Sequence, residues 1–336
     1  MVLNNKITGV SYFGFYKNSP VIEYNDYMTI SGRKFDTNKQ YYHLSNNKVF
    51  ALFGDRNGEV YVLKENNFVQ IHPRFDTCNV LSENLYVSYK LNGNVQDVSV
   101  CHNGLESIFS INTNKQLRCE KVHKDGVLLF YEFCKDSMII FYSTTGERLW
   151  EYKTENPDWK INRMCIPMVD DVVVIINNYN LMTVSIEGYN IKTGEKLWML
   201  HDDNNTDIFP CHFIVGDDKM LYACKSHWKN TDRKSKNIEL TSINPHNGEF
   251  NRHILKEVDQ HTVISPWNTC IYGNKLYYAD NRPGCVLGVV DLDKKQIVEE
   301  FSLNLKKGFT MGAPIVTEDK IYQFIRNKKE VWIFDK

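Results

Sequence analysis

The sequence lacks the features that would place it in a membrane or on a polyanion. No run of about 18 apolar residues occurs in the 336-residue chain, so no transmembrane helix is expected. The opening residues, MVLNNKITGVSYFGFYKN, contain no basic segment followed by an apolar run, so no secretion signal is expected. The 40 basic residues are balanced by 41 acidic ones, which argues against nucleic acid as the partner.

Cysteine pairs with metal-ligand or redox spacing are also missing. The chain has nine cysteines, an odd number, and no C-x-x-C motif. Most of them lie in apolar runs, as Cys134 does in LLFYEFC and Cys224 does in LYAC. Cysteines in apolar runs typically serve as small core residues, and they stay reduced in a reducing compartment. We therefore expect free thiols and a cytoplasmic protein.

The motifs of common catalytic and metal sites are absent as well. There is no H-x-H, H-E-x-x-H, G-x-S-x-G or phosphate-binding loop. The acidic stretch HDDNNTD at residues 201–207 lacks the glycine and the terminal glutamate of a calcium-binding EF-hand loop. From the sequence we assign no catalytic residue, no metal ligand and no cofactor.

What the sequence does contain is strand-forming residues in short runs. No window shows the sustained i, i+3, i+4, i+7 apolar spacing of an amphipathic helix. Instead, runs rich in Val, Ile, Tyr and Phe are broken by Asn, Asp, Gly and Lys. The 19 tyrosines and 18 phenylalanines agree with this pattern. The chain is predicted to be all-β.

Similar strand-like runs recur along the chain. Each is followed by a further strand-like run and, in most cases, by a polar turn and an outer run. The seven runs are KVFALFG at 48, NLYVSYK at 84, GVLLFYEF at 126, DVVVIIN at 171, KMLYACK at 219, KLYYADN at 275 and KIYQFIR at 320. Their starts lie 36 to 56 residues apart. Repeats of about 40–50 residues with four strands each are typical of β-propeller blades.

These repeats predict one β-propeller domain over residues 1–336, WD40-like in architecture, with seven four-stranded blades. Six or eight blades remain open, because the first 45 residues do not resolve into a clear repeat. The chain ends at VWIFDK, which matches a third strand and leaves no residues for a fourth. We therefore expect an N-terminal strand to complete the C-terminal blade, which would remove an open sheet edge.

One phrase is written almost twice, as YSTTGERLWEYK from residue 142 and NIKTGEKLWMLH from residue 190. Gly146 and Gly194 would supply positive φ in a tight turn. Trp150 and Trp198 follow at the same offset in the next strand. We predict that both indoles are structural and lie between adjacent blades, where the burial of an aromatic ring contributes strongly to stability.

The Thr-Gly-Glu-x-Leu-Trp pattern resembles the repeat of the quinoprotein-type (PQQ-like) β-propeller superfamily. The pattern is clear in residues 142–200 and weaker elsewhere. The stretch NPHNGEFNRHI keeps Asn247, Gly248 and Glu249 but has Arg252 in the tryptophan position. In DLDKKQIVEEF, Lys295 replaces the glycine and Glu299 the tryptophan.

The resemblance implies a fold and not an activity. The superfamily includes alcohol dehydrogenases as well as non-catalytic scaffolds such as the outer-membrane assembly lipoprotein. Its dehydrogenases use adjacent cysteines beside the quinone. This chain has no Cys-Cys pair, so we expect no quinone cofactor.

Binding to another protein is the function that the sequence favours. A propeller presents loops on a rigid scaffold, and Trp, Tyr and Arg supply interface hot spots. The loops between second and third strands and the links between blades carry the candidate binding residues. These are Arg56, Trp159, Arg163, Tyr179, Trp228, Arg233, His261, Arg282 and Lys328. Trp267, beside Pro266, is assigned to the core.

Two functional readings stay open at this point. The first is a scaffold or adaptor, with assembly factor and toxin-neutralising partner as roles that the sequence does not separate. The second is an enzyme that acts on a carbohydrate or another small polar ligand in the axial funnel, because propeller enzymes draw catalytic groups from different blades. Clustered carboxylates or histidines in the funnel would favour the enzyme.

Overall fold

The computed structural model describes most of the chain as β-structure. The residues that it describes are 1–16, 19–30, 32–36, 42–45, 50–53, 60–64, 67–72, 77–80, 85–92, 95–102, 106–113, 116–133, 136–162, 164–180, 182–202, 209–229, 233–305 and 310–336. Among them there is no α-helix and one 3₁₀ turn, η1 (Arg326–Lys328). The all-β prediction is confirmed. The described part of the chain contains no helical segment with the length and hydropathy that a membrane crossing requires.

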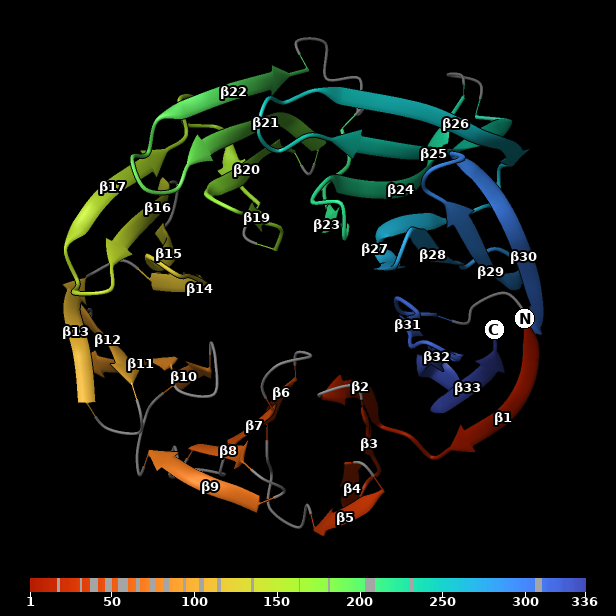
Figure 1. The fold of residues 1–336 in the computed structure, drawn as a ribbon, viewed down its shortest axis with the longest axis horizontal. Helices are drawn as coiled ribbons and strands as arrows, with labels where there is room; N and C mark the ends of the chain where they lie inside the picture. The colour runs from red at the N-terminus through yellow and green to blue at the C-terminus, as the bar shows by residue number, and fades with distance from the viewer. Residues whose placement is uncertain are drawn as a thin grey trace. The chain divides into compact units, whose positions relative to one another are not determined.

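The chain divides into two compact units. Unit 1 comprises residues 1–11, 164–190 and 195–336, and unit 2 comprises residues 12–163 and 191–194. The described sheets are antiparallel and have four strands each, except that the sheet of β20–β22 has five, with both β18 and β19 beside β20. Most neighbouring strands are consecutive along the chain, and the pairing of β1 with β33 is an exception. Figure 1 labels the strands and follows the chain from red to blue.

Unit 2 contains four sheets, each formed by one continuous part of the chain. The first two are β2 (Tyr12–Tyr16), β3 (Ser19–Glu23), β4 (Tyr27–Ile30) and β5 (Arg33–Asp36), then β6 (Tyr42–Ser45), β7 (Phe50–Phe53), β8 (Val60–Lys64) and β9 (Asn67–His72). The next two are β10 (Thr77–Val80), β11 (Leu85–Asn92), β12 (Val95–His102) and β13 (Glu106–Thr113), then β14 (Gln116–His123), β15 (Gly126–Phe133), β16 (Asp136–Ser143) and β17 (Arg148–Lys153). The short strand β18 (Lys160–Ile161) follows.

Unit 1 contains the other four sheets. Their strands are β19 (Met168–Val169), β20 (Val172–Tyr179), β21 (Met182–Asn190) and β22 (Lys196–His201), then β23 (Ile214–Val215), β24 (Leu221–Trp228), β25 (Ser235–Ile243) and β26 (Phe250–Asp259). The third sheet has β27 (Ile264–Tyr272), β28 (Lys275–Asp280), β29 (Gly284–Asp291) and β30 (Gln296–Leu305), and the fourth has β31 (Ile315–Val316), β32 (Lys320–Ile325), β33 (Glu330–Asp335) and β1 (Val2–Thr8).

All seven recurring runs of the sequence are second strands of sheets, as β7, β11, β15, β20, β24, β28 and β32. The described residues nevertheless form eight sheets, so the count of seven is not confirmed. The additional sheet is β2–β5, which fits into residues 12–36 because its strands have only four or five residues each. Strands this short leave too little sequence for a repeat to be recognised.

The predicted pairing of the chain ends is present. β1 pairs antiparallel with β33, from Val2 opposite Asp335 to Thr8 opposite Glu330, and the two strands lie side by side near the N and C labels in Figure 1. Asn4 donates from Nδ2 to both carboxylate oxygens of Asp335, at 3.0 and 2.8 Å. The pairing strand is VLNNKIT, a segment whose sequence shows little strand character.

Within unit 1, consecutive sheets pack face to face through side chains that alternate along each strand. In β24, Leu221 and Ala223 join a cluster with Val174 and Ile186 of the preceding sheet. Their neighbours Tyr222 and Cys224 point to the opposite face and join the following sheet. A strand that is buried on both faces needs a continuous apolar run, which is why KMLYAC does not alternate with polar residues.

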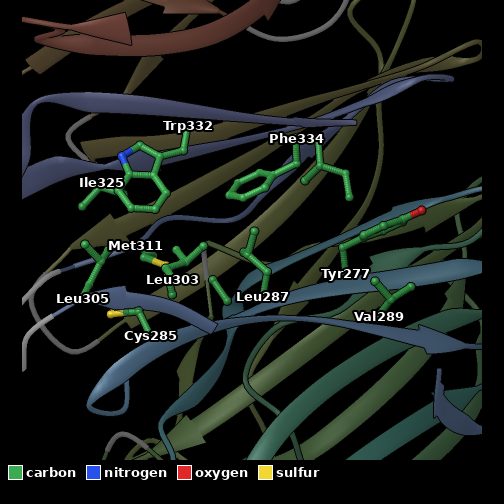
Figure 2. Close-up of a cluster of buried hydrophobic side chains, with 12 residues drawn as sticks. Tyr277, Cys285, Leu287, Val289, Leu303, Leu305, Met311, Ile325, Trp332 and Phe334 are labelled. Carbon is green, nitrogen blue, oxygen red and sulfur yellow. The ribbon is translucent and has the colours of Figure 1, made fainter. Parts of the chain in front are cut away.

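The next interface along the chain is built in the same way. Leu287 and Leu303 of the third sheet pack against Ile325, Trp332 and Phe334 of the last one, as Figure 2 shows. At about 25 cal/mol per Å² of buried apolar surface, such clusters supply the main stabilising free energy of the unit. Cys165, Cys211, Cys224, Cys270 and Cys285 are free thiols, as expected.

The tryptophan of each repeated phrase contacts the turn of the next repeat along the chain. Trp150 donates from Nε1 to the carbonyl of Ile191 at 2.5 Å, and its ring lies where a Cβ on Gly194 would stand. Trp198 does the same one repeat later, with the carbonyl of Pro245 at 2.6 Å and with Gly248. The structural role predicted for both indoles is confirmed. The turn glycine is required for positive φ and for the close approach of the ring.

Where the phrase has decayed, charged side chains stand in the tryptophan position and form ion pairs. Arg252 stands in the tryptophan position and forms a bidentate pair with the buried carboxylate of Glu239, at 2.9 and 2.7 Å. Glu299 stands in the next tryptophan position and binds the N-terminal ammonium group of Met1. Lys295 adopts φ 52° in the glycine position, so the turn conformation is kept without glycine.

We predict that Gly248→Ala destabilises the protein more than Gly273→Ala. Both glycines have positive φ, 74° and 61°, so backbone strain lowers the free energy of unfolding of each alanine variant by about 1–2 kcal/mol. A Cβ at residue 273 meets nothing within 4 Å, whereas at residue 248 it lies 2.7 Å from the Trp198 ring. The overpacking adds about 1–3 kcal/mol for Gly248→Ala alone. Denaturant unfolding of the two variants checks this, and equal losses of stability would contradict it.

Candidate functional site

The hairpins between second and third strands and the links into each first strand lie at the same end of a sheet. This follows from the antiparallel order, because the chain returns to that end after every second strand. In the last three sheets of unit 1 these segments comprise the hairpin 228–236, the link 260–263, the hairpin 281–283, the link 310–314 and the hairpin 326–329. We call their described residues the loop belt.

Hydrogen bonds connect the segments of the loop belt one after another. The amide of Asn281 donates to the carbonyl of Val263 at 3.1 Å, and its side-chain oxygen accepts from the amide of Met311 at 3.0 Å. The amide of Arg326 then donates to the carbonyl of Thr310 at 3.1 Å. Loops that are tied in this way hold their side chains in fixed positions, which lowers the entropy lost on binding.

A further connection joins the hairpin 228–236, which carries Trp228, to the link 260–263. The ammonium group of Lys236 lies 4.4 Å from the centroid of the Trp228 ring, in cation–π geometry. The same group donates to the carbonyl of Thr262 at 2.7 Å and so joins the hairpin to the link. Partial burial lowers the pKa of Lys236 from its usual value.

A buried carboxylate connects the link 260–263 to the hairpin 281–283. Asp280 is fully buried, and its Oδ1 accepts from the amides of Val263 at 2.8 Å and Arg282 at 3.0 Å. The guanidinium of Arg282 lies 2.9 Å from Asp280 Oδ2 and also reaches Glu300 at 3.2 Å. Burial raises the pKa of Asp280, and these donors act in the opposite direction.

The structure places the predicted binding residues in three groups. Trp228, Arg233, His261, Arg282 and Lys328 lie on or directly beside the loop belt, and Arg233, His261 and Lys328 are exposed. Tyr179 lies in unit 1 at the equivalent hairpin of the preceding sheet and is 37% exposed. Trp159 is half-buried in unit 2. Arg56 and Arg163 lie outside the described residues.

Two residues have surroundings that the sequence did not reveal. Arg282 serves as the counter-ion of Asp280 and Glu300, so its guanidinium is largely committed to the structure. Trp267, assigned to the core from the sequence, is 39% exposed, and its ring stacks on His212 with centroids 4.0 Å apart. The register of β27 is interrupted between Ile264 and Thr269, and this irregularity places the indole at the surface.

Sequence reasoning missed three residues that shape the site, namely Lys236, Val263 and Asp280. Asp280 had a visible signal, since it is an acid that ends the apolar run KLYYAD. Lys236 belongs to a basic run, and only the folded hairpin selects it as the partner of Trp228. Val263 ends the link 260–263 and is 47% exposed, which its apolar side chain does not predict.

Comparisons with known proteins identify the fold alone. No protein-family model matches the chain. No curated protein matches it either. Among solved structures, it is similar to BamB from Moraxella catarrhalis, with 12% identity, a TM-score of 0.58 and 99% of each chain covered.

Two further structures agree over the whole chain. The computationally designed Ika8 protein matches with 13% identity and a TM-score of 0.61, covering 100% of this chain and 98% of its own. Sqt1 from Saccharomyces cerevisiae matches with 11% identity and a TM-score of 0.52, covering 99% of each chain. The chain therefore has a β-propeller fold, and the comparisons assign nothing beyond the fold.

We predict that Asp280→Ala loosens the loop belt whereas Asp280→Asn largely preserves it. Alanine removes the acceptor of two backbone amides, while asparagine keeps an oxygen at the Oδ1 position. In Asp280→Ala the amides of Val263 and Arg282 should exchange with solvent at least about tenfold faster. Hydrogen exchange checks this, with the core amide of Ile238 as an internal reference. Equal exchange in both variants would contradict the role of Asp280.

Proposed function

We propose that this chain is a non-catalytic scaffold that binds another protein through the loop belt and the neighbouring hairpins of unit 1. One observation carries the proposal: the belt segments are hydrogen-bonded into a fixed surface while several of their large side chains remain in solvent. A pre-organised surface of this kind loses little entropy when a partner docks.

The exposed side chains at this end are of the types found in protein interfaces. Met164, Tyr179 and Trp267 are 64%, 37% and 39% exposed. Met164 lies on a link, Tyr179 ends β20, and Trp267 lies in the irregular first part of β27. Met, Tyr and Trp are enriched in protein interfaces relative to the rest of the surface. Trp228 and Arg233 add the two residue types that most often form hot spots.

We further propose that residues 1–336 form a single propeller in which the eight sheets are the blades and β1 closes the ring. The support is the β1–β33 pairing together with the full-length similarity to the solved structures. A cytoplasmic location is proposed because five of the nine cysteines are free thiols. Assembly factor and toxin-neutralising partner remain the two roles within this proposal.

The test is affinity capture with the full chain as bait, followed by quantitative mass spectrometry. The double variant Trp228→Ala, Arg233→Ala should lose most of the partner, since hot-spot residues contribute about 2 kcal/mol or more each. Tyr272→Ala is the matched control, because Tyr272 is an exposed aromatic residue in the turn between β27 and β28, at the opposite end of its sheet. A partner recovered equally with wild type, control and double variant would remove Trp228 and Arg233 from the binding surface.

A further inference from the structure

The exposed charges of the loop belt are mainly basic. Its two long hairpins carry six exposed cationic side chains, namely Lys229, Arg233, Lys234, Arg326, Lys328 and Lys329. Asp259, at the end of β26, is an exposed acidic residue at the border of the belt. The whole chain has a formal net charge of −1, so this excess reflects a segregation of charge toward the belt.

The acidic groups nearest to the belt already have partners. Asp280 is paired with Arg282, and Glu257 accepts from Lys229 at 2.6 Å. Asp280 and Glu257 are therefore already neutralised by Arg282 and Lys229 and do little to offset the other cations of the belt.

Three of the belt cations have no counter-ion in the described part of the chain. Arg233, Arg326 and Lys329 lie on the two hairpins, and no described carboxylate is within ion-pair distance of them. Two of these residues are arginines, whose planar guanidinium groups match carboxylates in a bidentate manner. The backbone of the second hairpin is held in place, since the amide of Arg326 donates to the carbonyl of Thr310 and the carbonyl of Lys329 accepts from the amide of Val10.

We propose that the partner presents an acidic segment to the loop belt, with Asp or Glu side chains facing the two basic hairpins. This inference rests on the proposed function and specifies the chemistry of the partner. Apolar residues of the segment would contact the edge of Trp228 at the base of the first hairpin and Val263 on the link that follows. Recognition of acidic motifs by clusters of arginine and lysine is a recurring mode of peptide binding.

The surroundings of Trp228 favour an acidic protein segment over single-stranded nucleic acid. Proteins that bind single strands offer open aromatic faces on which bases stack. Here the ammonium group of Lys236 lies over the ring of Trp228. The chain as a whole is near neutral, and so it lacks the excess of positive charge that is typical of proteins that bind phosphate backbones without sequence preference.

The test uses the full chain and a fluorescein-labelled peptide of eight glutamates and two leucines. Arg233→Glu, Arg326→Glu replaces two exposed cations, and we expect its affinity for the peptide to fall at least about tenfold. Lys275→Glu, Lys295→Glu is the matched control, because both residues are exposed in turns at the opposite end of the third sheet. The control should bind like wild type, and raising the salt from about 0.05 to 0.3 M should weaken binding by both.

Fluorescence anisotropy gives the affinities, and thermal unfolding midpoints within about 2 °C of wild type establish that both variants are folded. A peptide with lysine in place of glutamate and a poly-U oligonucleotide complete the set of probes. No binding of the acidic peptide, equal losses in both variants, or tighter binding of poly-U would each overturn the inference. If captured partners still depend on Trp228 while the acidic peptide fails to bind, the inference fails and the scaffold function stands.

Discussion

Burial of both faces of each sheet is the constraint on which the described structure of unit 1 depends. A four-stranded sheet with two apolar faces cannot be stable alone, and packing against a neighbour on each side covers both faces. Leu221 and Ala223 face one neighbouring sheet, and Tyr222 and Cys224 face the other. The same constraint explains why the second strands are the most apolar runs of the sequence and why they were the easiest to find.

Besides the packing between sheets, side chains of one repeat also contact the turn of the next repeat. Trp150 and Trp198 do this with an indole that covers a turn glycine and donates to a carbonyl of that turn. At the same position Glu299 of β30 binds the N-terminal ammonium group of Met1, beside β1 of the next sheet, whereas Arg252 pairs with Glu239 within its own sheet. Where the tryptophan is lost, the connection to the next sheet is therefore kept by an ion pair at Glu299 but not at Arg252.

The candidate site was partly accessible from the sequence, because antiparallel order alone assigns hairpins and links to one end of a sheet. This placed Trp228, Arg233, His261 and Lys328 on the loops where the structure has them. It could not show that Arg282 is the counter-ion of a buried acid, since Asp280 and Glu300 are contributed by different strands. Nor could it show that Trp267 is exposed, because this depends on an irregular register within β27.

The sequence by itself determined the all-β class, the seven strongest second strands and the turns that need positive φ, because strand propensity, two-faced burial and turn chemistry are local properties. It also indicated that an N-terminal strand pairs with the last one, from the missing fourth strand at the C-terminus. Only the tertiary structure decided that β1 is this strand, that residues 12–36 form a separate sheet, and how the loop belt is hydrogen-bonded. These features depend on pairing between distant residues, and no local pattern in the chain encodes a contact between Asn281 and Met311.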